Sequence, residues 1–473
     1  MRYCIKKMMA VAIGLIMIIN MSMTVYATEE VANTTEEPMA EEKSPELLAK
    51  EKATADAYAM KVESNEIKGW PQGPSTYNEA SIVMDVNSGA ILYAKNIDTK
   101  EYPASITKVL TSLIALENGN ATDKVTFTDD CVSFMKGGYS SIGMKAGEEI
   151  SLNDALYAML LASANEVAYA IAANVGENYD SFIQKMNQRA VELNCKNSHF
   201  VNANGLHDSQ HYTTARDMAL IGSEVIKHEE FKTITETLQY TIAPTSIVPE
   251  ERIFQQKHRM LKPTDKYYYE NCIAGKTGYT DEALSTLITW AQKDNLELVC
   301  VVLKSHGKNL YPDTRNLFDY AYGNFTKVPV RKEMLLEKDR KSVKTMAEDA
   351  YVVLPNGVDV KELETTIMED KENKKDGIVS YTYKGEPVGT TKVTLNESYF
   401  EKNKKETNIK KTEKKDSKKK RMSPKKKLFV GIMIVLGAVA TLAILLGIGL
   451  ILRKRELKRR RRKRRRRKRD RRL

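Results

Sequence analysis

Short apolar segments bounded by turn residues predict four β-strands in the first two thirds of the chain. The first two flank Asn87, Ser88 and Gly89, a sequence typical of a hairpin turn, and the last two flank a turn at 293–295. These strands cover residues 80–86, 90–94, 283–290 and 297–303.

Apolar residues at helical spacing fill the region between the early and late strands. Ser151 with Asp154 three residues later is a typical helix cap. The predicted helices cover residues 103–116, 155–162, 179–193, 214–228 and 314–322. The order predicts an α+β domain over residues 70–326, with a mixed sheet and inserted helices.

The pattern changes near residue 327 to short alternating segments separated by polar turns. Segments 350–354, 378–383 and 390–395 predict a small β-rich domain over residues 327–400. A lysine-rich linker follows at 401–427.

The first 27 residues combine Arg2, Lys6 and Lys7 with an apolar run and small residues before Ala27. This arrangement predicts a secretory signal peptide cleaved after Ala27, with an uncleaved anchor as the alternative. Residues 28–69 are acidic and have few large apolar side chains, so we expect a flexible spacer there.

The C-terminal segment 428–452 contains 25 residues without a charge, which is long enough to cross a bilayer as one helix. Residues 453–473 carry 17 Lys and Arg and two acidic residues, so they are expected to stay in the cytoplasm. The predicted topology is single-pass in the cell membrane, with an extracytoplasmic catalytic domain.

The formal net charge of +12 comes from the ends of the chain, since residues 28–400 are acidic overall. Because the part of the chain expected to fold is acidic, its charge gives no support to nucleic-acid binding. The four cysteines beyond the signal peptide show no paired metal-ligand spacing, and their redox state stays open.

Three short motifs contain the candidate chemistry. Ser105 lies three residues before Lys108, which places both on one helix face, where a neutral lysine can deprotonate a serine. The same spacing recurs at Ser133, Ser305, Ser417 and Ser423, so it is weak alone. Ser163 with Asn165, and Lys276-Thr277-Gly278 followed by Tyr279, complete the set in the order used by serine acyl-transfer enzymes.

The chain resembles the low-molecular-mass penicillin-binding proteins, the serine-type D-alanyl-D-alanine carboxypeptidases. The resemblance runs from about residue 80 to 322 and includes segments 102–108, 140–148, 160–166, 202–208 and 275–280. Segment 385–389 resembles the family's C-terminal β-domain. The implied fold is a penicillin-binding domain with an antiparallel sheet and a helical subdomain.

The resemblance also implies a role for each motif residue. Ser105 is the nucleophile, Lys108 its base, and Ser163 the relay that protonates the leaving amine. Asn165 binds the donor peptide, and Lys276 keeps Lys108 neutral while it attracts the substrate carboxylate. The substrate-binding residues on the last motif are Lys276, Thr277, Gly278 and Tyr279, with the N–H groups of Ser105 and Tyr279 as the oxyanion hole.

The implied substrates are peptidoglycan stem peptides, the implied inhibitors are β-lactams, and no metal or cofactor is needed. Alternatives are a β-lactamase, a DD-endopeptidase or an inactive penicillin-binding scaffold.

One position departs from the family. Tyr311 occupies the place of a basic residue that helps hold the terminal carboxylate, so we expect Lys308 or Arg315 to supply that charge. We interpret His199, His207 and His211 as polar loop residues that position the motifs instead of a metal site. We interpret the tyrosines at 267–269 as a packed or surface loop instead of a sugar platform.

Overall fold

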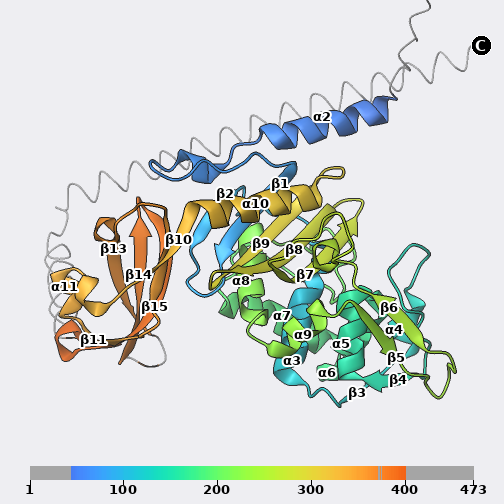
Figure 1. The fold of residues 1–473 in the computed structure, drawn as a ribbon. Helices are drawn as coiled ribbons and strands as arrows, with labels where there is room; N and C mark the ends of the chain where they lie inside the picture. The colour runs from blue at the N-terminus through green and yellow to red at the C-terminus, as the bar shows by residue number, and fades with distance from the viewer. Residues whose placement is uncertain (1–43, 371–372, 374, 401–473) are drawn as a thin grey trace, which may run out of the picture. The chain divides into compact units, whose positions relative to one another are not determined.

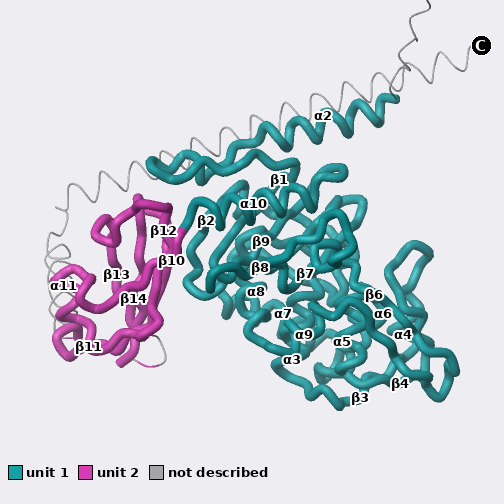
Figure 2. Tube along the Cα trace, in the orientation of Figure 1, with its two compact units in different colours: residues 1–325 teal, residues 326–473 magenta. Residues whose placement is uncertain are grey.

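The computed structural model describes residues 44–370, 373 and 375–400. These residues form two compact units, which divide between Phe325 and Thr326 (Figure 2). The predicted signal peptide, basic linker, membrane span and cytoplasmic tail all lie outside the described residues. Within the described part, no helix is long and apolar enough to cross a membrane.

A five-stranded sheet forms the centre of unit 1, in the order β2-β1-β9-β8-β7. All its neighbouring pairs are antiparallel, so the prediction of a mixed sheet was wrong. Successive strands joined by short turns pair antiparallel, as β1 with β2 and β7, β8 and β9 with one another. The strands are β1 Asn78–Asp85, β2 Ile91–Lys95, β7 Cys272–Thr280, β8 Leu284–Lys293 and β9 Leu296–Ser305.

Helices cover both faces of this sheet (Figure 1). On β9, Val299, Val301 and Leu303 join the main buried core with α8, and the intervening side chains point to the other face. Helix α10 covers that second face, where it contacts β1, β8 and β9. The helices around the sheet are α3 Lys108–Asn118, α7 Tyr179–Glu192, α8 Ala215–Val225 and α10 Leu310–Asn324.

A mainly helical subdomain interrupts the sheet between β2 and β7. Its helix α5 begins after Ser151, whose side chain accepts a hydrogen bond from the Asp154 N–H as the sequence predicted. The subdomain also contains two small two-stranded sheets, β3 with β4 and β5 with β6, which the sequence did not predict. The elements are α4 Asp129–Ser133, α5 Leu152–Leu161, α6 Asn165–Val175, α9 Glu229–Glu236, β3 Lys124–Thr126, β4 Glu149–Ser151, β5 Gln239–Ile242 and β6 Arg252–Gln255.

The described part of the predicted spacer is not irregular, because Pro45–Ala59 forms helix α2 and Glu63–Glu66 a short 3-10 helix. Ser44 caps α2 and Pro45 fits its first turn. The fully buried Lys95 ammonium holds the other end, since it donates to the carbonyls of Ala57 and Thr76 at 2.7 Å each. Acidic composition therefore misled us about local structure.

Unit 2 is β-rich, in agreement with the fold class that the sequence predicted. Its main sheet has the order β11-β15-β14-β13, and β10 pairs with β12. Predicted segments 350–354, 378–383 and 390–395 correspond to strands, while β11 and β13 were missed. The strands are β10 Phe325–Pro329, β11 Val343–Met346, β12 Tyr351–Pro355, β13 Glu364–Glu369, β14 Asp376–Tyr383 and β15 Glu386–Leu395, with helix α11 Glu337–Arg340.

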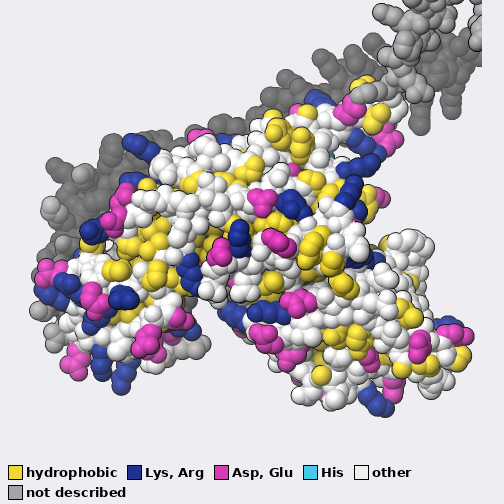
Figure 3. All heavy atoms as spheres, in the orientation of Figure 1, with side chains coloured by type: hydrophobic (Ala, Val, Ile, Leu, Met, Phe, Trp, Pro, Cys, Tyr) yellow, Lys and Arg dark blue, Asp and Glu magenta, His cyan; other side chains and the backbone are white. Residues whose placement is uncertain are grey.

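Charged side chains of both signs are interspersed on the face drawn in Figure 3. That face shows no continuous basic surface among the described residues, which fits the acidic composition of residues 28–400. The described surface therefore lacks the single-sign field that a polyanion would need on this side.

Candidate active site

Ser105 lies in the 3-10 helix η2, Ala104–Thr107, and Lys108 begins α3. We expected one α-helix from Pro103 onward, but the first turn is tighter. The two side chains still meet, with 3.0 Å between Lys108 Nζ and Ser105 Oγ. Thr286 on β8 donates to the Pro103 carbonyl at 2.8 Å, which ties this turn to the sheet.

Two glycines leave room for the backbone around the nucleophile. A Cβ on Gly205 would lie 1.9 Å from the Ala104 carbonyl oxygen, and one on Gly278 would lie 2.8 Å from the Ser105 nitrogen. Gly205 also has a φ of +82°, which favours glycine, and Ala104 has a φ of 50°. The nucleophile turn is therefore a strained backbone segment held between two others, a feature common at functional sites.

Lys108 is fully buried, and its ammonium group has no contact with solvent. Burial, followed by the positive charge of Lys276, lowers the pKa of Lys108 well below its ordinary value. Its Nζ lies 2.8 Å from Asn165 Oδ1 and 2.5 Å from the Asn204 carbonyl oxygen. The lowered pKa favours the neutral amine, the form in which Lys108 can act as a base.

The three contacts can satisfy the three N–H donors of a protonated Lys108, and they also suit the neutral amine that its lowered pKa favours. A neutral lysine has two N–H donors and one lone pair. Asn165 Oδ1 and the Asn204 carbonyl are pure acceptors and take both donors. The lone pair is left to accept the Ser105 hydroxyl proton, which is the orientation that deprotonation of the serine requires.

Ser163 and Lys276 form the second pair in the site. Lys276 Nζ donates to Ser163 Oγ at 2.9 Å and to the Thr277 carbonyl at 2.7 Å. Burial, and then the charge of Lys257, lower the pKa of Lys276 to about 7. Ser163 has a φ of 62°, another strained position. Ser163 thus has a partner that can pass it a proton.

Thr277, Gly278 and Tyr279 lie on β7 itself, although we expected their motif to precede a strand. Strand β7 is at the edge of the five-stranded sheet and pairs only with β8 among the described residues. Its outer backbone groups therefore remain available to an extended ligand. The Tyr279 side chain is 63% exposed and its hydroxyl donates to Asp281 at 3.1 Å.

Lys257 is a third lysine in the site, and sequence reasoning missed it. Its Nζ donates to Ser140 Oγ at 3.1 Å, and its charge lowers the pKa of both Lys108 and Lys276. Burial lowers the pKa of Lys257 as well, while the Glu166 carboxylate opposes this shift. Nothing in the sequence distinguished Lys257 among 74 Lys and Arg residues.

Glu166 was also missed, although it follows Asn165 directly. Its buried carboxylate accepts hydrogen bonds from the Ser141 hydroxyl at 2.6 Å and the Ile142 N–H at 2.7 Å. These bonds hold the 140–143 loop against the start of α6. Because Ser140 in this loop contacts Lys257, Glu166 positions one wall of the site.

His211 holds the turn that contains Ser105 in place through a hydrogen bond with Thr107. Its Nδ1 accepts from the Val201 N–H at 3.1 Å, so its Nε2 donates to Thr107 Oγ1 at 2.8 Å. Burial lowers the pKa of His211 to about 3, which keeps this tautomer neutral. This agrees with our interpretation of His211 as a positioning residue. The described residues contain no His, Cys, Asp and Glu cluster suited to a metal ion.

The expectation that Arg315 reaches the site was wrong. Arg315 lies on α10, on the face of the sheet away from α8, and donates to the Tyr268 carbonyl. Tyr311 is on the same helix, and its ring stacks on Tyr267. The other candidate, Lys308, is exposed in the loop after β9, and its role stays a prediction.

The arrangement can carry out acyl transfer, because it combines a serine, a neutral amine base, a second serine–lysine pair and an open strand edge. Asn165 joins the two halves, since it contacts Lys108 and follows Ser163 by two residues. The motifs that lie 57 to 171 residues apart in sequence thus meet in one place.

Comparison with known proteins agrees with this chemistry. Residues 69–307 match the Peptidase S11 family, described as D-alanyl-D-alanine carboxypeptidase. The D-alanyl-D-alanine carboxypeptidase DacF of Bacillus subtilis is 28% identical over 326 residues, which cover 66% of this chain and 80% of the relative. DacA of Escherichia coli K12 is 28% identical over 309 residues, covering 61% and 73% respectively.

A solved structure shows the same fold. The Streptomyces K15 DD-transpeptidase is 26% identical, with a TM-score of 0.50. The match covers 54% of this chain and 100% of that one. It supports the antiparallel sheet and helical subdomain described above.

Proposed function

The chain belongs to the serine-type D-alanyl-D-alanine carboxypeptidases, and we propose that it removes the terminal D-alanine from peptidoglycan stem pentapeptides through an ester on Ser105. The observation that carries this proposal is the Lys108 amine. It is fully buried, gives both N–H groups to fixed acceptors, and lies 3.0 Å from Ser105 Oγ.

Acylation begins when Lys108 takes the Ser105 proton and Ser105 Oγ attacks the carbonyl carbon between the two D-alanines. The developing oxyanion accepts hydrogen bonds from the N–H groups of Ser105 and Tyr279. Gly278 supports this role, because only a glycine lets β7 approach the Ser105 nitrogen so closely.

Collapse of this intermediate breaks the C–N bond, and the leaving amine of D-alanine needs a proton. Ser163 supplies it and is resupplied by Lys276, 2.9 Å away. The proton that Lys108 took from Ser105 then restores Lys276, so Lys108 is neutral again before the ester is hydrolysed. The ester on Ser105 remains. Water then attacks the ester with Lys108 again as the base, which releases the shortened peptide and restores the Ser105 hydroxyl.

The substrate binds in an extended form along the open edge of β7. Its terminal carboxylate meets Lys276 and Thr277, and the amide of Asn165 donates to the peptide on the donor side. A β-lactam acylates Ser105 by the same route, since it also presents a strained amide and a carboxylate. The binding of the peptide and the binding of the β-lactam both depend on the position of β7 at the edge of the sheet.

The direct test compares Ser105→Ala with Ser133→Ala in the full chain. Ser133 also precedes a lysine by three residues, but both are exposed and lie outside the site. Ser105→Ala should lose D-alanine release from a pentapeptide and covalent labelling by a fluorescent penicillin, while Ser133→Ala keeps both. Labelling without release would favour an inactive scaffold, and labelling of Ser105→Ala would refute the nucleophile.

The alternatives are separated by substrate. A DD-endopeptidase would cleave crosslinked dimers at a rate comparable to pentapeptide, and a β-lactamase would release hydrolysed β-lactam rapidly. We expect slow turnover of both compared with pentapeptide. The fused β-rich unit 2 adds no support to the β-lactamase alternative.

We further propose that residues 28–400 face the cell exterior and that segment 428–452 anchors them. The uncharged run and the 17 basic residues beyond it support this topology. Protease added to intact cells should remove the catalytic domain and spare the tail. A chain ended before Leu428 should be secreted in active form, and an inactive product would contradict a purely tethering role.

A further inference from the structure

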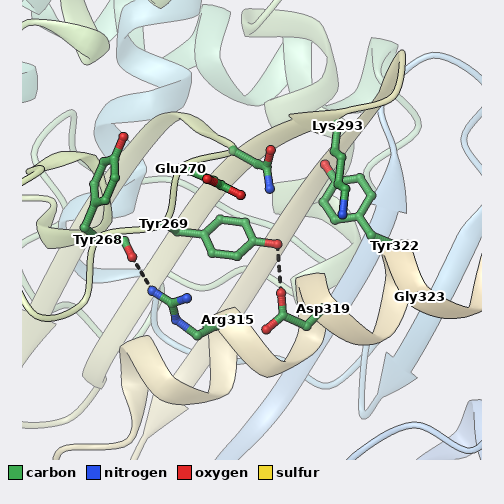
Figure 4. A pocket seen from close by; sticks show the side chains of 9 residues that line it. Tyr268, Tyr269, Glu270, Lys293, Arg315, Asp319, Tyr322 and Gly323 are labelled. Carbon is green, nitrogen blue, oxygen red and sulfur yellow. Dashed lines mark hydrogen bonds between the residues drawn. The ribbon is translucent and has the colours of Figure 1, made fainter.

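A pocket of about 420 Å³ lies in unit 1 between the loop before β7, the end of β8 and helix α10 (Figure 4). Its size falls within the ~300–1000 Å³ typical of ligand pockets. Nine residues line it, namely Tyr268, Tyr269, Glu270, Asn271, Lys293, Arg315, Asp319, Tyr322 and Gly323.

This pocket is separate from the catalytic centre. Arg315, Asp319 and Tyr322 come from α10, which covers the sheet face opposite to α8. The catalytic Lys276 and Ile288, its partner on β8, instead face the α8 side, where Ile288 approaches Gly222. No residue of the pocket contacts Ser105, Lys108 or Ser163.

The pocket walls are held in place by a chain of contacts (Figure 4). Arg315 donates to the Tyr268 carbonyl, and its guanidinium carbon lies 5.2 Å from the centre of the Tyr269 ring. The Tyr269 hydroxyl in turn donates to Asp319 Oδ1 at 3.0 Å. The pocket is therefore pre-formed, so ligand binding would need little further ordering of its side chains and would lose little binding free energy to that ordering.

Tyr268, Glu270 and Lys293 complete the lining. Tyr268 is 38% exposed, and within the described part of the chain the side chains of Lys293 and Glu270 have no hydrogen bond or ion pair. The lining contains two cations and two carboxylates, so it offers no net field for a polyanion. Balanced charges beside an aromatic ring instead suit a neutral ligand with many hydroxyl and amide groups.

We propose that this pocket binds the glycan strand of peptidoglycan, a neutral chain of N-acetylated amino sugars, and so revise our interpretation of the tyrosine loop. One pyranose ring of the strand offers an apolar C–H face to Tyr268, while hydroxyl and acetamido groups of the sugars beside it reach Glu270 and Lys293, which lie further along the pocket (Figure 4). The inference rests on the proposed function. A second contact with the polymer raises the effective concentration of stem peptides at Ser105.

The test uses the full chain in detergent and a soluble tetramer of N-acetylglucosamine, which contains no peptide. Tyr268→Ala removes the ring but keeps the carbonyl that Arg315 needs, so the fold should persist. Its control is Tyr58→Ala, another exposed tyrosine on α2. Calorimetry should show that Tyr268→Ala binds the tetramer roughly fivefold more weakly than Tyr58→Ala.

A second variant, Glu270→Gln, tests the polar contacts without removing the ring and should also weaken binding. Release of D-alanine from a soluble pentapeptide is measured on every variant. It should be unchanged, while the KM for intact peptidoglycan rises for Tyr268→Ala. Equal tetramer affinities in Tyr268→Ala and Tyr58→Ala, or no binding by any form, would overturn the glycan site.

The two proposals fail separately. Tetramer binding without any D-alanine release would remove the proposed reaction and keep the pocket. Release without tetramer binding would remove the pocket alone. A free stem peptide that binds in a Tyr268-dependent way, where the tetramer does not, would show that the pocket holds peptide, and the glycan assignment would be wrong.

Discussion

The two faces of the central sheet treat charged side chains in opposite ways. On the α8 face, Lys108 and Lys276 are buried, and their pKa values are lowered. On the α10 face, Lys293 and Arg315 line an open pocket with two carboxylates. The difference teaches that burial lowers the pKa of an amine, which a base requires, whereas balanced exposed charges suit reversible binding.

Lys95, which lies outside the active site, shows that burial alone does not make a lysine a base. Lys95 is as buried as Lys108, and its pKa is lowered to about 8. Its partners are the carbonyls of Ala57 and Thr76 and, at 3.3 Å, the hydroxyl of the fully buried Thr76, whereas Lys108 contacts the partly exposed Ser105 hydroxyl. Neighbouring groups, and not burial, therefore separate the structural lysine from the catalytic one.

The strongest way to break the comparison is Lys108→Arg. Arginine stays protonated and so carries a fixed positive charge, which means that the base is lost. We expect acylation by a fluorescent penicillin to slow by ~10²–10⁴-fold. Lys136→Arg is the matched control, because Lys136 has the same spacing from a serine but is exposed. Near-normal acylation by Lys108→Arg would show that a fixed charge suffices.

The second prediction sharpens the division between the faces through the substrate carboxylate. Lys308→Ala should slow turnover of the free acid far more than of its amide, because only the acid carries the charge. A charge-assisted contact is worth ~1.5–3 kcal/mol, on the order of 10- to 150-fold in rate. Arg315→Ala, on the other face, is the control. If neither variant discriminates, Lys276 and Thr277 hold the carboxylate without further help.

The smallest expected effect concerns pH. Because the pKa of Lys276 is about 7, this lysine loses its proton above that pH and no longer attracts the carboxylate. The kcat/KM for the free acid should therefore fall as pH rises through 7. Lys257→Met removes a positive charge near Lys276, so its pKa rises and the fall shifts to higher pH. Stopped-flow or steady-state profiles of both forms measure the shift.

The control for that experiment is Lys266→Met, an exposed lysine beside Tyr267. Its profile should overlay the unmodified enzyme. If the fall in kcat/KM at high pH occurs at the same pH in Lys257→Met, a group other than Lys276 causes it.

The sequence predicted the elements with strong local patterns and the motif residues that meet around Ser105. It could not predict Lys257, because its contact with Ser140 joins residues 117 positions apart and follows an unpatterned hairpin. Helix α2 was missed for a different reason. Its residues favour a helix, but the segment is acidic and has no strong apolar stripe to show that one face is buried. Whether two strands pair parallel or antiparallel depends on how the chain connects them. The pattern of apolar and polar residues does not reveal these connections.

The open edge of β7 has a consequence for handling the protein. Unpaired backbone groups that receive one extended peptide will receive any other, including a strand of a neighbouring molecule. At high concentration the enzyme should therefore form reversible dimers through this edge. A covalent penicillin occupies the same row of groups, so it should act as a solubilising agent for storage and crystallisation.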